Sequence, residues 1–375
     1  MKKVAIITFH SSHNYGSVLQ AYALQNFILK LGYKCEIINF RTERQIDLYT
    51  VFTKRKGIKY LFKNASHLLY YKSLSKRYIK FEEFINNHLK LTDKTYRELS
   101  ELEDANFDYD YYISGSDQIW NPVPADFDWA FYLAFVKKGK RISYAPSFGQ
   151  LGSTGDGETK SLIRHYLSNY DSVSVRDYIA QGIVKEFINI LPPITLDPTL
   201  LLKKEEWNGL VDQDYSANKE YIFFYTLSAN KEIIKVAEIL SKKLKLPIIT
   251  SNFSNQYDVF SSYIKKFDTG PKDFLSLIKN AKLVLASSYH GTIFSILFNK
   301  PFYSFKGNQD ARISYLLEIT GLKSRSIDLS NIHEESNNAF NIDYNSANIR
   351  IEKEREKSLL FLKKALEIED KNEDM

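Results

Sequence analysis

The stretch AKLVLASSYHGTIFSILFNKPFYSF, residues 281–305, decides the fold that this sequence predicts. Its apolar run from Leu283 to Ala286 indicates a buried strand, and the polar segment 287–291 indicates a tight turn. Residues 292–298 then have helical spacing, and a second strand is predicted over 301–305. This alternation of strand, turn, helix and strand is typical of a parallel α/β sheet with helices on its faces.

The turn in this stretch is a candidate ligand site. Open α/β sheets bind ligands at the carboxyl ends of their strands, and the free backbone amides that begin the next helix favour an anion. We therefore expect Ser288, His290 and Gly291 to contact a ligand. A single histidine is also often structural, so this pattern by itself leaves both interpretations open.

The length of the chain, 375 residues, exceeds what one hydrophobic core usually supports, so two domains are expected. Pro198 of the LDP segment and the run of charges that follows at residues 203–206 place the boundary near residue 205. We expect a Rossmann-like domain over residues 1–205, a second one with the His290 turn over 206–345, and a helix with a frayed tail over 346–375.

Composition and cysteine content restrict the class of protein. Cys35 is the only cysteine, which excludes a disulfide framework and a cluster of thiolate ligands. The apolar run that begins the chain, MKKVAIITF, is too short for a signal peptide, and no segment has the length of a membrane span. A cytoplasmic protein is expected. The net charge of +6 comes without any nucleic-acid-binding signature, so no nucleic-acid partner is expected.

A basic segment, residues 54–80, has nine lysines and arginines and no acidic residue, and aromatic residues are interleaved with the cations. Anionic membrane surfaces attract such segments, so a peripheral contact at the inner face of the membrane is one interpretation. The other interpretation is a solvated face of ordinary helices.

The first loop follows a strand predicted over residues 3–9 and precedes a helix predicted over 18–31, with Ser17 as its cap. The loop has one glycine, so it lacks the three of a dinucleotide-binding fingerprint. Its last residues, Asn14, Tyr15 and Gly16, would lie at the helix amino terminus, where they could meet a sugar hydroxyl or an anion. A structural turn would have the same sequence.

The segment ISGSDQIWNP follows a strand predicted over residues 109–113. Ser116 and Asp117 come at the carboxyl end of that strand, and Trp120 follows closely, so a carboxylate would lie beside an aromatic platform for a sugar. The alternative is structural, with Asp117 as a helix cap and Trp120 as a core residue.

Two arginines are candidates for holding an anion. Arg176 follows a strand predicted over 172–175, and Arg312 opens a helix after the strand at 301–305. A guanidinium group offers a planar pair of donors to a carboxylate or a phosphate. A salt bridge between Arg176 and Asp177 is the structural alternative.

Six segments, taken together and in order, resemble the polysaccharide pyruvyl transferase family. They are ITFHSSHNYGSVLQAYALQ, ISGSDQIWNP, SYAPSFG, SVRD, LDPTLL and SSYHGTIFSILFNKPF, and they extend over nearly the whole chain. The resemblance implies two Rossmann-like domains facing across a cleft, similar to GT-B glycosyltransferases, with the acceptor on the amino-terminal side. It also implies phosphoenolpyruvate as donor, a sugar diol of a surface polysaccharide or its lipid-linked precursor as acceptor, and a cyclic pyruvate ketal and phosphate as products.

The resemblance also suggests roles for individual residues. His290 would be the acid that protonates the donor, because an imidazole can carry a proton at neutral pH beside a dianion. Asp117 would be the base for an acceptor hydroxyl, and Arg176 and Arg312 would hold the donor. Some family members have Arg-Leu-His-Gly where this chain has Ser-Tyr-His-Gly at residues 288–291, so the two arginines would replace a missing cation. No metal or other cofactor is expected.

Two other functions stay open on the sequence. A nucleotide-sugar glycosyltransferase could have the same two-domain architecture, since fold does not fix function. A non-enzymatic scaffold, associated with carbohydrate or membrane, could use the same residues only to hold turns. Binding of phosphoenolpyruvate, of a nucleotide or of neither distinguishes the three.

Overall fold

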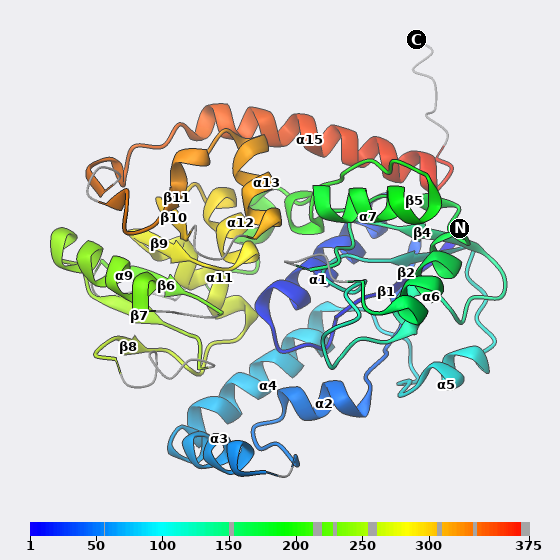
Figure 1. The fold of residues 1–375 in the computed structure, drawn as a ribbon, viewed down its shortest axis with the longest axis horizontal. Coiled ribbons are helices and arrows are strands. Elements are labelled where there is room, and N and C mark those ends of the chain that lie inside the picture. The colour runs from blue at the N-terminus through cyan, green and yellow to red at the C-terminus, as the bar shows by residue number, and fades with distance from the viewer. Residues whose placement is uncertain are drawn as a thin grey trace.

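The computed structural model describes residues 1–55, 57–149, 154–212, 220–227, 231–253, 261–305, 310–332 and 336–368. These residues form two parallel β-sheets, each covered by helices (Figure 1). The strand order is β2-β1-β3-β4-β5 in the first sheet and β11-β10-β9-β6-β7-β8 in the second. The predicted α/β class with two Rossmann-like halves is confirmed.

The first sheet comes from the amino-terminal half of the chain. Its strands are β1 (Lys3–Ile7), β2 (Lys34–Ile37), β3 (Tyr111–Ser114), β4 (Lys140–Ser143) and β5 (Ser172–Val173). Its helices are α1 (Tyr15–Lys30), α2 (Glu43–Tyr49), α3 (Ile58–Leu69), α4 (Tyr71–His88), α5 (Leu99–Glu103), α6 (Gly157–Leu167) and α7 (Tyr178–Ile188), with 3-10 helices at Trp129–Tyr132 and Pro198–Leu200.

The second sheet comes from the carboxyl-terminal half. Its strands are β6 (Ile222–Tyr225), β7 (Ile248–Thr250), β8 (Ile264–Lys265), β9 (Leu283–Ala286), β10 (Phe302–Phe305) and β11 (Ser326–Ile327). Its helices are α8 (Lys204–Asn208), α9 (Lys231–Leu244), α11 (Pro271–Asn280), α12 (Tyr289–Leu297), α13 (Ala311–Thr320) and α15 (Tyr344–Ala365), with 3-10 helices at Lys323–Arg325 and Ser336–Asn338.

The strand predicted from Leu283 to Ala286 is β9, in the middle of the second sheet, where all four side chains are buried as a parallel strand requires. The helix after it begins earlier than predicted, at Tyr289, because the side chain of Ser288 caps it by accepting a hydrogen bond from the Gly291 amide at 3.3 Å. His290 therefore lies in the first turn of α12 and not in a loop.

The predicted cap of the first helix is wrong. Helix α1 begins at Tyr15, and Asn14 is the cap, with its side chain accepting a hydrogen bond from the Gly16 amide at 2.9 Å. Ser17 lies inside the helix, where its hydroxyl donates to Asp117 at 2.6 Å. The short side chain of asparagine can bond to the backbone two residues ahead, so it competes with serine for the capping position.

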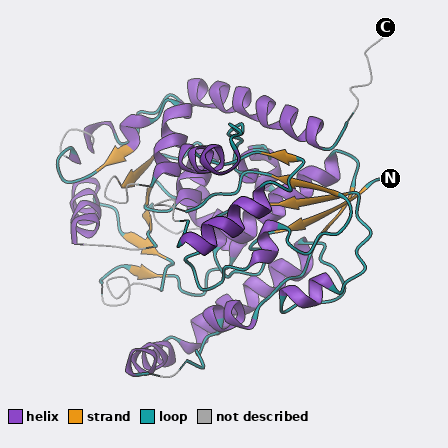
Figure 2. Ribbon diagram, turned by 45° about the vertical axis from the view of Figure 1, so that its right-hand side comes forward, coloured by secondary structure: helices purple, strands orange, loops and turns teal. Residues whose placement is uncertain are grey.

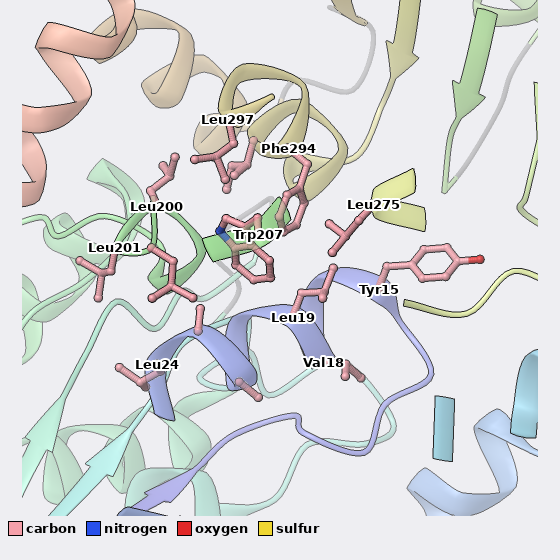
Figure 3. Close-up of a cluster of buried hydrophobic side chains, with 14 of the residues drawn as sticks. Tyr15, Val18, Leu19, Leu24, Leu200, Leu201, Trp207, Leu275, Phe294 and Leu297 are labelled. Atoms are coloured by element: carbon pink, nitrogen blue, oxygen red, sulfur yellow. The ribbon is translucent and has the colours of Figure 1, made fainter. Parts of the chain in front are cut away.

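One hydrophobic cluster connects the two halves of the molecule. Leu19 of α1, Trp207 of α8 and Phe294 of α12 belong to it, and Figure 3 shows the indole between the two helices. The rings of Trp207 and Phe294 meet edge to face, with centroids 4.9 Å apart. The two sheets therefore share a packed core.

Helix α15 also joins the halves, because it extends along one side of the molecule from the second sheet back to the first (Figure 1). Arg355 donates to the Leu200 carbonyl at 2.8 Å, and the Leu196 amide donates to Ser358 at 2.9 Å. Just beyond the helix, the Leu366 carbonyl accepts a hydrogen bond from the Tyr111 hydroxyl at 2.8 Å.

Candidate functional site

The amino termini of four helices meet near the middle of the molecule, between the two sheets (Figure 1). Gly16, His290 and Arg312 lie in the first turns of α1, α12 and α13, and Arg176 lies just before Asp177, the cap of α7. Helix amino termini present free backbone amides and a partial positive charge. Residues from four predicted strand-to-helix turns, far apart in the sequence, are thus brought together.

Arg176 and His290 share one carboxylate, that of Asp197. Nη1 of Arg176 donates to Oδ2 of Asp197 at 2.8 Å, and Nε2 of His290 lies 3.3 Å from the same oxygen. The other oxygen of Asp197 accepts hydrogen bonds from Thr199, from its amide at 3.0 Å and its hydroxyl at 2.7 Å. These bonds fix the carboxylate, so it can hold the side chains of Arg176 and His290 in place.

Arg176 also faces a second carboxylate. Its Nη2 lies 3.5 Å from Oδ1 of Asp117, while Nη1 contacts Asp197, so the guanidinium separates the two acids. Asp117 has a φ of +75°, a backbone conformation that costs a non-glycine residue on the order of 1 kcal/mol. Such strain at a buried carboxylate beside an arginine is typical of functional sites.

The charges in this cluster set the pKa values of its acids. Burial alone would raise the pKa of Asp117, but the charges of Arg176 and His290 and the Ser17 hydrogen bond hold it below its usual value. The pKa of Asp197 is lowered in the same way, because His290 and Arg176 outweigh the burial. Both carboxylates are therefore ionised at neutral pH.

Three buried polar atoms of the cluster lack a hydrogen-bond partner within the part of the chain that the structure describes. They are Nε and Nη2 of Arg176 and Nε2 of His290, although Nη2 and Nε2 lie within ion-pair distance of the Asp117 and Asp197 carboxylates. Leaving a buried polar group unpaired costs about 1–3 kcal/mol. An anion that accepted hydrogen bonds from these atoms would recover that free energy.

Arg312 lies beside this cluster but is paired more completely. Its Nε and Nη2 both donate to Asp310, the cap of α13, at 2.9 and 2.6 Å. The ring of Tyr289 lies close to both arginines, 4.9 Å from the guanidinium carbon of Arg176 and 5.6 Å from that of Arg312. The site therefore has two buried cations that contact one aromatic ring.

The other predicted site residues divide into two groups. Asn14, Gly16, Ser288 and Gly291 lie at the helix amino termini that form the cluster, as described above. Tyr15, Ser116 and Trp120 lie in the core.

The three core residues all have internal partners. Tyr15 is fully buried, stacks on Phe274 at 4.4 Å between centroids and donates to the Thr269 carbonyl at 3.1 Å. The hydroxyl of Ser116 donates to the Ala145 carbonyl at 2.7 Å. Trp120 is fully buried against Tyr132 and donates to Ser114 at 3.2 Å. It is therefore a core residue, as the structural alternative predicted.

Three residues of the cluster had no predicted role: Asp197, Tyr289 and Asp310. Asp197 belongs to the LDPTLL segment, one of the six that carry the family resemblance, and this membership was the signal that could have identified it. Tyr289 and Asp310 have no comparable signal, because only the assembled helices place them beside the arginines.

A second buried polar cluster follows strand β1. Nε2 of His10 lies 3.2 Å from Oδ1 of Asn39, which also accepts a hydrogen bond from Arg41 at 3.0 Å. Arg41 and His13 each bind one oxygen of Glu82, at 2.9 and 2.8 Å. Burial would raise the pKa of Glu82, but these two hydrogen bonds bring it down to about 2.

Among the described residues, no group of three or more histidine, cysteine, aspartate or glutamate side chains is placed to hold a metal ion. No helix among them is both long enough and apolar enough to cross a bilayer.

Comparison with known proteins identifies both a family and a fold. The model of the family described as polysaccharide pyruvyl transferase matches residues 14–308. A search of curated protein sequences found no match.

Solved structures resemble the chain over almost its whole length. S. aureus MnaA, solved with UDP, is 14% identical over 98% of each chain, with a TM-score of 0.54. UDP-GlcNAc 2-epimerase of Methanocaldococcus jannaschii, solved with UDP-GlcNAc and UDP, is 15% identical over 96% of this chain and 100% of its own, with a TM-score of 0.53. Anabaena Alr3699/HepE, in complex with UDP and glucose, is 9% identical over 97% of this chain and 100% of its own, with a TM-score of 0.53. At these identities the similarity shows the fold alone, and it confirms the predicted GT-B-like architecture.

Proposed function

The chain belongs to the polysaccharide pyruvyl transferase family, and from this premise we propose that it transfers pyruvate from phosphoenolpyruvate to a saccharide diol. The products would be a cyclic pyruvate ketal and phosphate. The observation that carries the proposal is the set of unpaired buried atoms of Arg176 and His290, at a point where four helix amino termini meet. A donor with a phosphate and a carboxylate matches this positive environment.

Each step of the reaction has a residue in reach of the cluster. As the first acceptor hydroxyl bonds to C2 of phosphoenolpyruvate, His290 gives a proton to C3 and Asp117 takes the hydroxyl proton. The C2–O bond to phosphate then breaks, and phosphate leaves with the electron pair. The second hydroxyl bonds to C2 and passes its proton to His290, which restores the acid and completes the ketal, and the proton held by Asp117 leaves with the phosphate.

The arrangement of charges supports these roles. Arg176 lies between Asp117 and the pair of Asp197 and His290, so its guanidinium separates the proposed base from the proposed acid. Arg176 and Arg312, which both contact the ring of Tyr289, would hold the anionic donor and stabilise the charge on the leaving phosphate. These protein cations would supply the positive charge, so the proposed reaction uses no metal and no cofactor. Asp197 would act as a positioning residue for both partners.

The setting of the reaction is part of the proposal. The acceptor would be a surface polysaccharide precursor, free or carried on a lipid, and the enzyme would work in the cytoplasm at the inner face of the membrane. The family supports a saccharide acceptor in general. The amino-terminal half, with Asp117, would take the acceptor.

A thermal-shift experiment with phosphoenolpyruvate and UDP-sugars side by side tests the proposal. We expect phosphoenolpyruvate to raise the Tm of the wild type, because a ligand stabilises the state that it binds. The increase should be lost in Arg176→Ala and kept in Arg164→Ala, which removes an exposed arginine. Stabilisation by UDP or UDP-sugars and not by phosphoenolpyruvate would contradict it and favour a nucleotide-sugar glycosyltransferase. No response to either would favour the scaffold.

A further inference from the structure

Helix α3 presents an apolar face to solvent. Ile58, Leu61, Leu68 and Leu69, here called the α3 stripe, are exposed by 73%, 69%, 68% and 80%. Their spacing of three, ten and eleven residues from Ile58 places them on one side of the helix. A surface helix normally turns such a stripe toward the core, so its exposure requires an explanation.

The opposite side of α3, which faces the protein, is polar. Asn64 exchanges two hydrogen bonds of 3.1 Å with the backbone of Thr53. His67 hydrogen-bonds the Val51 carbonyl and meets the ring of Phe253 edge to face, with centroids 5.0 Å apart. The helix is thus held with its polar side inward, and the α3 stripe is left outside by these contacts.

The α3 stripe lies at an extremity of the molecule. Figures 1 and 2 both show α3 and the beginning of α4 projecting away from the two sheets. Lys54, Lys72 and Lys76 are exposed in this region, and Tyr71, exposed by 49%, adds an amphipathic ring. The sequence has no acidic residue between Asp47 and Glu82.

Not all cations of the basic segment are available to a membrane surface, because three of them have partners within the protein. Arg55 pairs with Asp47 and Lys80 with Asp273, each at 2.8 Å, and Arg77 donates to the Ser251 carbonyl at 2.9 Å. Residue 56 and the side chains of residues 59 and 63 lie outside the described part. Among the described residues, the electrostatic attraction therefore depends on the three exposed lysines, and the apolar contact depends on the leucines and Ile58.

We propose that the α3 stripe inserts into the surface of an anionic bilayer. The leucines and Ile58 would enter the boundary of headgroups and acyl chains, while the lysines and Tyr71 stay at the level of the headgroups. A flat, negative surface fits a single projecting helix with cations beside it and no acids in its segment. This proposal goes beyond the proposed transfer reaction, because lipid binding needs neither donor nor acceptor.

The docked helix would be connected to the candidate site. Helix α4 leads from α3 back to the body, where the Arg77 guanidinium lies 4.7 Å from the ring centre of Tyr15, next to Gly16. Insertion of α3 would therefore hold the amino terminus of α1 near the bilayer. A lipid-carried saccharide could reach the site from that side.

Flotation of the full chain with vesicles tests the proposal. We expect the wild type to float with vesicles of phosphatidylcholine and phosphatidylglycerol, and less at high salt or with phosphatidylcholine alone. The double substitution Leu61→Glu, Leu68→Glu should lower the ratio of bound to free protein about tenfold or more, because charges would replace the apolar groups that enter the bilayer. Lys72→Gln with Lys76→Gln should weaken binding and reduce its salt dependence.

Matched variants separate docking from a general change of charge. Ile190→Glu with Leu191→Glu alters two exposed apolar residues elsewhere, and Lys138→Gln with Lys160→Gln removes two exposed lysines elsewhere. Both controls should float like the wild type. Circular dichroism should show all variants folded, since every altered side chain is exposed.

Two outcomes would overturn the proposal. The first is equal flotation of the wild type and the Leu61→Glu, Leu68→Glu variant. The second is a lipid-free dimer, detected by sedimentation, that the same variant abolishes, because a second copy of the chain would then cover the stripe. Neither outcome changes the thermal shift expected with phosphoenolpyruvate, so the proposed transfer reaction and the proposed membrane insertion can fail separately.

Discussion

The imidazole of His290 lies directly against the backbone of Gly16. A Cβ atom added at Gly16 would lie 2.0 Å from Nδ1 of that ring, far inside van der Waals contact. Glycine at position 16 thus permits α1, from the first half of the chain, to approach the histidine that opens α12 in the second half. The position of His290 is set jointly by this contact and by Asp197.

Replacement of Gly16 by alanine should therefore displace the ring of His290. We expect kcat for pyruvyl transfer to fall about a hundredfold, because a displacement of 1 Å in a catalytic group can cost that much. Gly182→Ala is the matched control, since a Cβ atom there meets nothing within 4 Å in the middle of helix α7. A variant at position 16 with full activity would show that His290 does not need this placement.

Replacement of Arg176 by lysine should weaken binding of phosphoenolpyruvate while the charge is kept. Lysine cannot reach Asp197 and a ligand with the paired donors of a guanidinium, so we expect Kd to rise about tenfold. Isothermal titration measures this, and Arg164→Lys at an exposed position should leave Kd unchanged. Unchanged affinity in the Arg176 variant would make that residue structural.

Replacement of Asp197 by asparagine should lower the free energy of unfolding by about 3–5 kcal/mol, because it leaves the buried charge of Arg176 with less compensation. Chemical denaturation measures this change. Asp108→Asn is the control, since Asp108 pairs with Lys3 at the surface and its loss should leave the denaturation midpoint unchanged. Equal stability of the two variants would contradict the central role of Asp197.

The His10 cluster predicts a pH dependence of stability. Burial, with a smaller contribution from the Arg41 charge, lowers the pKa of His10 from 6.5 to about 4. Between these values the unfolded chain binds a proton that the folded chain does not, so stability rises with pH there. This contribution of His10 to the free energy of unfolding is about 3 kcal/mol. It is fully present above pH 6.5 and is lost as the pH falls to about 4.

Unfolding measured across this pH range tests that expectation. His10→Gln should reduce the slope of stability against pH, whatever its effect on the absolute stability. His165→Gln, at an exposed position, should keep the slope of the wild type. An unchanged slope in the His10 variant would assign the dependence to other groups, such as His13, whose pKa burial also lowers.

The sequence by itself determined the parts of this protein that depend on local periodicity. The apolar run Leu283–Ala286 became the buried strand β9, and the strand predicted over residues 301–305 became β10 (Phe302–Phe305). Ordered matches with a known family indicated the family and the two-domain fold, because several segments in the right order are more specific than any single motif. The sequence did not determine the cap of α1, since Asn14 and Ser17 are both good capping residues and only the packing of α1 selects between them.

Tertiary structure alone decided which of these residues meet. Asp197 holds both Arg176 and His290, although no local pattern connects the three, because the shared core of the two sheets brings their helix amino termini together. Other long-range contacts bury Trp120 fully in a second core cluster, and those of Asn64 and His67 turn the polar side of α3 inward while leaving Leu61 outside. Which side of a helix or a tryptophan ring is covered depends on the neighbours that long-range contacts supply, and the sequence around that residue does not contain them.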